Sequence, residues 1–160
     1  MEKRKLEITY SLYQQAAELS SDEISLLEAA LEATDRAYAP FSGFRVGCAV
    51  LLRDGSIITG NNQENRAYPS GICAERTALF HIGSIGKGNQ IEKIAIRARS
   101  DKKQIIVPAM PCGGCRQVMV EYEQITGKPF IILSQGVSGE ILRMEGVQDS
   151  LMPFSFDIEF

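Results

Sequence analysis

Two short cysteine motifs constrain this chain more than any other feature of its sequence. They are Cys73-Ala74-Glu75 and, 39 residues further along, Pro111-Cys112-Gly113-Gly114-Cys115. Together they offer three sulfur ligands to one metal ion and leave its fourth position open. Structural zinc sites usually have four protein ligands, whereas catalytic zinc sites have three and leave the last position to water. The sequence therefore predicts a fold that brings both motifs to a single catalytic zinc ion.

Each motif is expected at the start of a helix, where free N–H groups and the helix dipole stabilise thiolates. Glu75 follows the first ligand by two residues, so its carboxylate can enter the same cavity without binding the metal. It is the candidate general acid and base, although a first-turn Glu also stabilises a helix dipole. Arg76 is a candidate for offsetting thiolate charge, and its alternative is a surface helix arginine.

Two other interpretations of the cysteines stay open at this point. A Cys-x-x-Cys pair occurs in redox dithiols, and a closed structural zinc site would need a fourth ligand. Only His81 or Cys48 is available for that role, but His81 lies two helical turns beyond Cys73. Cys48 lies in an apolar stretch and is expected in the core. The motif order and spacing favour the three-cysteine catalytic site.

Composition excludes several other classes of function. The chain has 160 residues, a net charge of −3 and a pI of about 5.3, which argues against a nucleic-acid partner. No signal-like apolar region follows the basic residues near the N-terminus, and no apolar stretch is long enough to span a membrane. Four cysteines do not resemble a disulfide framework, so we expect a cytoplasmic protein.

Hydrophobic periodicity predicts an α/β domain. Helices are expected from Ser20, which has capping-box spacing to Glu23, to just before Pro40, and over 73–85 and 113–122. Strands are expected over 46–52, 56–60, 91–98, 130–133 and 140–144, with an extended segment over 5–12. Arg53-Asp54-Gly55 predicts a hairpin between the first two of these strands. Strands that alternate with helices indicate helices packed on a mixed sheet.

Over roughly residues 22–156 the chain resembles the homotetrameric cytidine deaminases, a family of zinc-dependent enzymes. The matching segments are residues 39–47 (APFSGFRVG), 62–65 (NQEN), 68–69 (YP), 73–78 (CAERTA) and 111–117 (PCGGCRQ). The resemblance implies a three-layer α/β/α sandwich around a mixed sheet of about five strands. It also implies a single domain over residues 1–160, with 1–20 as an N-terminal extension.

The resemblance assigns roles to individual residues. Cys73, Cys112 and Cys115 would hold one Zn²⁺ per subunit, and Glu75 would be the catalytic acid and base. The implied substrate-binding residues are Phe44 on the pyrimidine, Asn62 and Glu64 on the ribose, Ala74 and Glu75 on the base edge, and Tyr68 and Phe156 at a neighbouring subunit's substrate. Without the resemblance, Asn62 and Glu64 would be interpreted as loop residues and Phe44 as core.

The implied activity is hydrolytic deamination of cytidine and deoxycytidine to uridine and deoxyuridine, with release of ammonia. A homotetramer with sites near subunit interfaces is expected, with a small nucleoside as partner and neither nucleic acid nor membrane. The apolar and aromatic segment over 151–160 agrees with such assembly. Arg66 and Ala67 depart from the family pattern. A deaminase of another aminated nucleoside or base and a catalytically silent zinc-binding relative are the alternatives.

Overall fold

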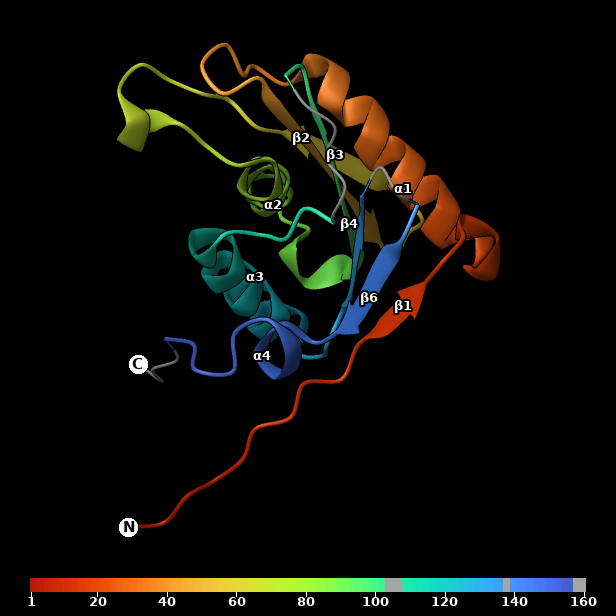
Figure 1. Ribbon diagram of the computed structural model, residues 1–160, viewed down its shortest axis with the longest axis vertical. Coiled ribbons are helices and arrows are strands. Elements are labelled where there is room, and N and C mark those ends of the chain that lie inside the picture. The colour runs from red at the N-terminus through yellow and green to blue at the C-terminus, as the bar shows by residue number, and fades with distance from the viewer. Residues whose placement is uncertain (103–107, 137–138, 157–160) are drawn as a thin grey trace.

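A mixed six-stranded sheet forms the centre of the protein in a computed structural model that describes residues 1–102, 108–136 and 139–156 (Figure 1). Residues 157–160 of the aromatic C-terminal segment lie outside the described residues. The strands run in the order β1-β6-β5-β4-β2-β3, and of the neighbouring pairs only β4 and β5 are parallel. The strands are β1 (Ser11–Tyr13), β2 (Phe44–Leu52), β3 (Ile57–Asn61), β4 (Ile91–Ser100), β5 (Ile131–Gln135) and β6 (Ile141–Glu145).

The sheet has one strand more than expected. Its sixth strand, β1, comes from the N-terminal segment and pairs antiparallel with the edge strand β6. Only three residues of that segment pair, whereas the alternation over 5–12 predicts a longer extended element. Residues 1–10 continue as an arm that leaves the body of the molecule (Figure 1). The alternating pattern identifies an extended conformation, but pairing needs a partner strand that only the folded sheet supplies.

Helices cover both faces of the sheet, which confirms the three-layer arrangement. The helix α1 (Ser21–Ala33) lies on one face, and α2 (Ala74–Ser84), α3 (Gly113–Thr126) and α4 (Val147–Ser150) lie on the other (Figure 1). Short 3-10 turns add η1 (Ala16–Glu18), η2 (Thr34–Arg36), η3 (Tyr68–Ser70) and η4 (Gly88–Gln90). No helix within the described ranges is long and apolar enough to cross a membrane.

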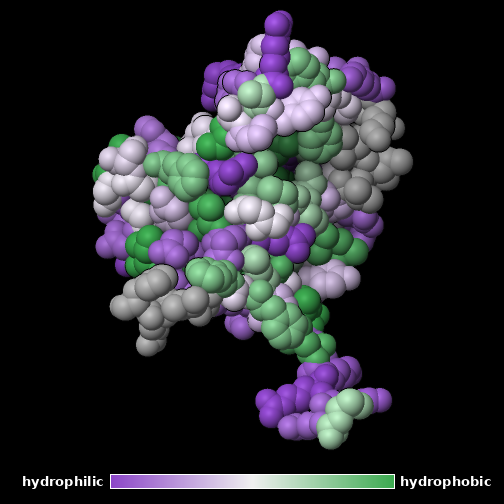
Figure 2. All heavy atoms as spheres, turned by 90° about the vertical axis from the view of Figure 1, so that its left-hand side faces the viewer, coloured by the Kyte–Doolittle hydropathy of each residue, from purple (hydrophilic) through white to green (hydrophobic). Residues whose placement is uncertain are grey.

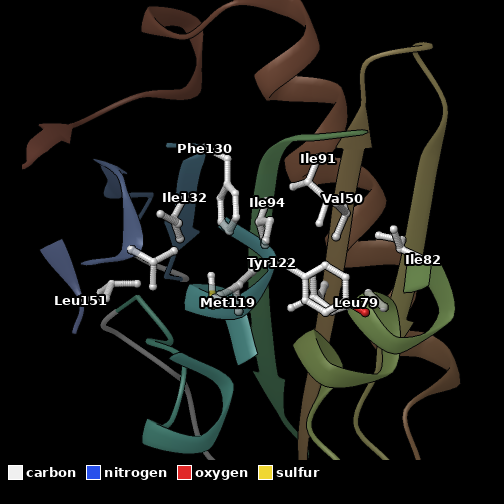
Figure 3. Packing of buried hydrophobic residues seen from close by; sticks show 14 of the residues in the cluster. Val50, Leu79, Ile82, Ile91, Ile94, Met119, Tyr122, Phe130, Ile132 and Leu151 are labelled. Atoms are coloured by element: carbon white, nitrogen blue, oxygen red, sulfur yellow. The ribbon is translucent and has the colours of Figure 1, made fainter. Parts of the chain in front are cut away.

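Each face of the sheet has its own hydrophobic core. The larger core joins α2, α3 and α4 to the sheet and contains Val50, Leu79, Ile94, Met119 and Phe130 (Figure 3). The smaller core lies under α1, with Leu26, Leu27 and Ala30 against Ala49 of β2 and Ala95 of β4. Successive strand residues point to opposite faces, so Val50 and Ala49 enter different cores.

The first helix is shorter than the sequence pattern predicts. The capping box between Ser20 and Glu23 is present at its start, as expected. Its helical end, however, is Ala33 rather than a residue next to Pro40, because the chain tightens into η2 and then turns extended at Ala37. Tyr38, which a helix reaching Pro40 would include, lies beyond that end and is largely exposed. The expected hairpin is present, and Gly55 occupies its turn with a φ of 81°.

Candidate active site

Two helices that cover the same face of the sheet begin at one place, and the three cysteines lie there. Cys73 is the N-cap residue of α2, Cys112 is the N-cap residue of α3, and Cys115 lies in the first turn of α3. The helix starts are therefore as the sequence predicts, and α3 has an exposed ligand at its cap and a buried one inside. The fold joins two motifs that are distant in the chain.

The spacing of the sulfur atoms fits a tetrahedral metal ion. The Sγ atoms of Cys73 and Cys112 are 3.8 Å apart, those of Cys112 and Cys115 are 3.5 Å apart, and all three lie within 4.8 Å of one another. A Zn–S bond of about 2.3 Å in a tetrahedral site requires sulfur atoms about 3.8 Å apart. The site could therefore hold zinc with little rearrangement.

A closed structural zinc site lacks a fourth ligand in the part of the chain that the structure describes, and a redox dithiol would use only two of the three sulfur atoms. Among the described residues, only these three cysteines form a group of potential metal ligands. His81 is exposed on α2, away from the sulfur atoms, and Cys48 is fully buried in the larger core, as expected. The cysteines are free thiols, and the sulfur of Cys73 lies 3.8 Å from that of Cys112, so all three gather at one point.

Positive charge and N–H groups surround the sulfur atoms. Three thiolates on Zn²⁺ carry a net charge of about −1, and the N-termini of α2 and α3 both face this charge. The Arg76 guanidinium Nη2 donates to the Cys73 sulfur at 3.7 Å. Hydrogen bonds, first from Cys115 and then from Arg76 and Cys112, outweigh the effect of burial and lower the pKa of Cys73 to about 5. Cys73 is thus prepared to act as a thiolate ligand.

Glu75 lies in the first turn of α2 and is only 4% exposed. Burial raises the pKa of its carboxyl, and the nearby sulfur of Cys73 raises it further. The residue lines a recess of about 410 Å³ together with Cys73 and Cys112. A carboxyl with a raised pKa in such a recess is suited to accept and return a proton.

The start of α2 is held in place by a close contact that the sequence analysis did not single out. A Cβ built on Gly60 of β3 would lie 2.5 Å from both the carbonyl oxygen of Ala74 and the amide nitrogen of Ala78. Only glycine allows this approach. The Thr77 hydroxyl lies 3.1 Å from the carbonyl oxygens of Asn61 and Cys73 and can donate to either. These contacts fix the first ligand against β3.

Glycine often supplies the flexibility of a tight turn, but the two glycines of the second motif do not have that role. Gly113 and Gly114 are helical residues of α3, and neither has a positive φ. A Cβ on either would meet no atom within 4 Å. The turn before α3 therefore does not depend on glycine flexibility, and the two residues instead leave open space beside Cys112.

All of the expected substrate-binding residues except Phe156 line one cleft with two connected parts. The part that contains Glu75 also has Phe44 and Ala74 in its wall, and Ile96 and Met110 complete its apolar lining. The second part, about 580 Å³, is lined by Tyr68 and the loop around it. Both parts share Ser42, Asn62, Glu64 and Cys73. The face from which this loop projects is visibly hollowed, with hydrophobic residues inside the hollow (Figure 2).

Asn62 and Glu64 hold the wall of the cleft together. The Asn62 side chain accepts from the Val46 amide at 2.8 Å and donates to the Phe44 carbonyl at 2.9 Å. Glu64 accepts from the Phe41 amide at 2.8 Å and lies in the part of the cleft that has Tyr68. The Ser42 amide also donates to this carboxylate, at 3.3 Å.

Phe156 is the one expected site residue that the fold does not bring to this cleft. It is 66% exposed, and its backbone binds Gln117 on α3. It lines neither part of the cleft as the described residues form it. Tyr68 is at the cleft but 82% exposed. Ser42, Ile96 and Met110 line the cleft without having been singled out, because only strand register and loop closure bring them there.

Three sulfur ligands at two helix N-termini, with a buried carboxyl beside them, define the architecture of a zinc hydrolase with an open metal position. The family model for the cytidine and deoxycytidylate deaminase zinc-binding region matches residues 20–128. A cytidine deaminase of Halalkalibacterium halodurans is 41% identical over 138 residues, which cover 86% of this chain and 96% of that protein.

Solved structures give the same result. A crystal structure of cytidine deaminase from Burkholderia pseudomallei superposes with a TM-score of 0.71 and 35% identity, covering 82% of this chain and 97% of that one. Cytidine deaminase from Mycobacterium tuberculosis gives a TM-score of 0.65 and 30% identity, over 87% and 100% of the two chains. The chain belongs to the cytidine and deoxycytidylate deaminase family, whose members are zinc enzymes.

Proposed function

We propose that this protein hydrolyses cytidine and deoxycytidine to uridine and deoxyuridine, with release of ammonia. The observation that carries the proposal is the buried Glu75 in a cleft beside three cysteines with sulfur atoms 3.5 and 3.8 Å apart. This set of groups can activate water and move a proton, and the similar proteins from other organisms are named cytidine deaminases.

Cys73, Cys112 and Cys115 would hold the zinc. When bound there, the ion would supply polarisation of the attacking water and lower its pKa toward ~7. Glu75 accepts a proton from this water and passes it to N3 of the pyrimidine, which makes C4 electrophilic. After the water oxygen has bonded to C4, Glu75 accepts the second proton from that oxygen and delivers it to the leaving amine. The C4–N bond then breaks as the C4=O bond of the product forms, and ammonia leaves. General acid and base transfer of this kind contributes typically about 10²–10⁴-fold.

The walls of the cleft would orient the nucleoside. The Phe44 ring packs on the pyrimidine, and the Ala74 backbone with Glu75 binds the base edge. Hydrogen bonds from Ser42, and from the Phe41 amide, lower the pKa of Glu64, so this carboxylate is ionised. It accepts from ribose hydroxyls, while Asn62 keeps the adjoining strand in place. An anionic carboxylate at the sugar also disfavours a phosphorylated substrate.

We propose a homotetramer with its sites near the subunit interfaces. Support comes from two aromatic residues that a single subunit leaves largely uncovered, Tyr68 at the cleft and Phe156 outside it. In the assembly each would reach the substrate of a neighbouring subunit. A monomer in light scattering would remove both residues from the site.

We further propose that residues 1–160 form one domain with 1–20 as an N-terminal extension, and that the protein is cytoplasmic. The free cysteines support this location, because thiol ligands persist in a reducing compartment. Neither nucleic acid nor a membrane is a partner in this proposal, in accordance with the net charge of −3.

Zinc analysis combined with an ultraviolet assay on four substrates tests the function. We expect one zinc per subunit and turnover of cytidine and deoxycytidine, with little or none of adenosine or cytidine monophosphate. Preference for adenosine or the monophosphate would identify a related deaminase of another substrate. Stoichiometric zinc without an absorbance change on any substrate would identify a catalytically silent relative and contradict the proposal.

A further inference from the structure

The side chain of Gln117 binds the backbone of Phe156 at two points. Its amide Nε2 donates to the Phe156 carbonyl at 2.9 Å, and its Oε1 accepts from the Phe156 amide at 3.1 Å. A glutamine side chain thus pairs with one residue as a neighbouring β-strand would. Only a carboxamide offers both a donor and an acceptor in this arrangement.

Two further contacts hold the rest of the C-terminal segment, which we define as residues 151–156. Arg116 Nη1 donates to the Leu151 carbonyl at 3.0 Å, and the Gln148 side chain donates to Ser155 Oγ at 3.3 Å. The same Arg116 donates from Nε to the Pro111 carbonyl at 2.8 Å, directly before the ligand Cys112. The segment is therefore fixed to the turn of α3 that carries the metal ligands.

The geometry of α3 directs the segment away from the cleft of its own subunit. Gln117 follows the ligand Cys115 by two residues, which places it about 200° around the helix. The two side chains thus leave opposite sides of α3. In agreement with this, Phe156 lines neither part of the described cleft. Its backbone is held while the residue as a whole is 66% exposed, an arrangement that presents the ring outward.

We propose that Gln117 is a positioning residue that fixes the Phe156 backbone and so presents the ring to the cleft of a neighbouring subunit. The inference rests on the proposed function, in which Phe156 contacts a neighbour's pyrimidine. A ring on an unrestrained segment would lose conformational entropy each time it covers a substrate, and a held backbone avoids most of that loss. Gln117 therefore acts on substrate affinity through Phe156, without touching the substrate.

The test uses the zinc-loaded full-length enzyme and the variant Gln117→Met, which keeps the side-chain length and removes both hydrogen bonds. We expect faster hydrogen–deuterium exchange in the C-terminal peptide and a KM for cytidine raised roughly three- to tenfold, the range of one aromatic contact. The kcat and the zinc content should stay at the values of the unmodified enzyme. Gln14→Met, an exposed glutamine near β1, is the matched control and should change none of these quantities.

A double-mutant cycle separates positioning from general loss of structure. Phe156→Ala should raise KM to a similar extent, and adding Gln117→Met to it should raise KM no further. Additive KM effects, or unchanged exchange in Gln117→Met, would overturn the role of Gln117. If Phe156→Ala leaves KM unchanged while Gln117→Met still frees the segment, the proposed function of Phe156 is wrong and the positioning role falls with it. Should Gln117→Met fold poorly, Gln117→Glu keeps the acceptor and removes the donor, and we expect a smaller shift of the same kind.

Discussion

At the scale of single residues, the proposed chemistry depends on a carboxyl in an environment that disfavours its charge. Glu75 is nearly buried, and both burial and the adjacent sulfur raise its pKa. A carboxylate in water has a low proton affinity, so it would be a weak base toward the attacking water. Burial in the recess brings its proton affinity closer to that of the groups with which it exchanges.

We predict that Glu75→Gln keeps the fold and the zinc but lowers kcat by at least about 10²- to 10⁴-fold. The amide has the same shape and cannot take the proton from water. Steady-state kinetics by ultraviolet absorbance, with zinc measured on the same samples, checks this. Glu121→Gln on the exposed side of α3 is the control and should remain fully active. Near-native turnover of Glu75→Gln would show that another group shuttles the proton.

At the scale of elements, the metal site depends on where two helices begin. The start of α2 is pressed against β3 at Gly60, where the helix backbone occupies the space of a side chain. The start of α3 is tied by Arg116 to the carbonyl of Pro111. A shift of either helix by a fraction of an ångström would change the separations of the sulfur atoms. Contacts behind ligands of this kind tune metal affinity.

Gly60→Ala tests this dependence. The new Cβ would lie 2.5 Å from backbone atoms of Ala74 and Ala78, so α2 must move away from the sheet. We expect a loss of about 1–3 kcal/mol in unfolding free energy and weaker zinc retention in a chelator competition. Gly114→Ala, whose Cβ meets open space, should not lower the melting temperature. If the two variants had equal stability and equal zinc retention, the close contact at Gly60 would not matter for the metal site.

At the scale of the whole molecule, the buried carboxylate of Glu23 links α1, β4 and β6 at the edge of the smaller core. Glu23 of α1 accepts from Ser20 at its own N-cap and from Arg143 Nε of β6 at 3.1 Å, and lies 3.5 Å from Lys93 Nζ of β4. Burial opposes its ionisation, but the hydrogen bonds from Ser20 and Arg143 outweigh it and lower the pKa. Asp22, beside the same lysine, has its pKa lowered to about 2, chiefly by Lys93.

Because folding lowers the pKa of Glu23, we expect the folded protein to lose stability in acid. A carboxyl whose pKa is lower in the folded state stabilises the fold above its unfolded pKa, near 4.5 for Glu23, and that contribution is lost as the pH falls through the folded pKa. We expect the melting temperature of the unmodified protein to fall more between pH 5 and pH 3 than that of Glu23→Gln. Comparing the two proteins cancels the loss of zinc at low pH. If the melting temperatures of both proteins fell equally with pH, the Glu23 carboxylate would not contribute to stability.

Truncation of the N-terminal segment distinguishes the exposed arm from the residues that follow it and pack on the sheet. Residues 1–10 are exposed, and side-chain hydrogen bonds join Arg4 to Glu2 and Lys5 to Glu7 within the arm. We expect removal of these ten residues to change the melting temperature by less than about 2 °C. Removal through Leu19 should lower it clearly, because β1 then leaves the sheet and Leu19 leaves the smaller core. Equal melting temperatures of the two truncated proteins would contradict this division.

The amino-acid sequence by itself determined the local features of this protein. The three ligands, the carboxylate beside them, both helix starts and the hairpin at Gly55 follow from residue type and short-range spacing, because caps, turns and metal ligands act over a few residues. Resemblance to relatives added the family and the expected roles of Phe44, Asn62 and Glu64. Periodicity was less reliable at the end of α1, where the chain tightens before the pattern ends.

Only the tertiary structure decided how distant segments meet. It recruited β1 as a sixth strand, brought Gly60 against the start of α2, and placed Phe156 on Gln117 outside the cleft of its own subunit. No local pattern encodes these contacts, since each joins residues far apart in the chain whose separation depends on the whole packing. The sequence specifies which groups can do the chemistry, and the packed sheet and helices specify how far apart they lie.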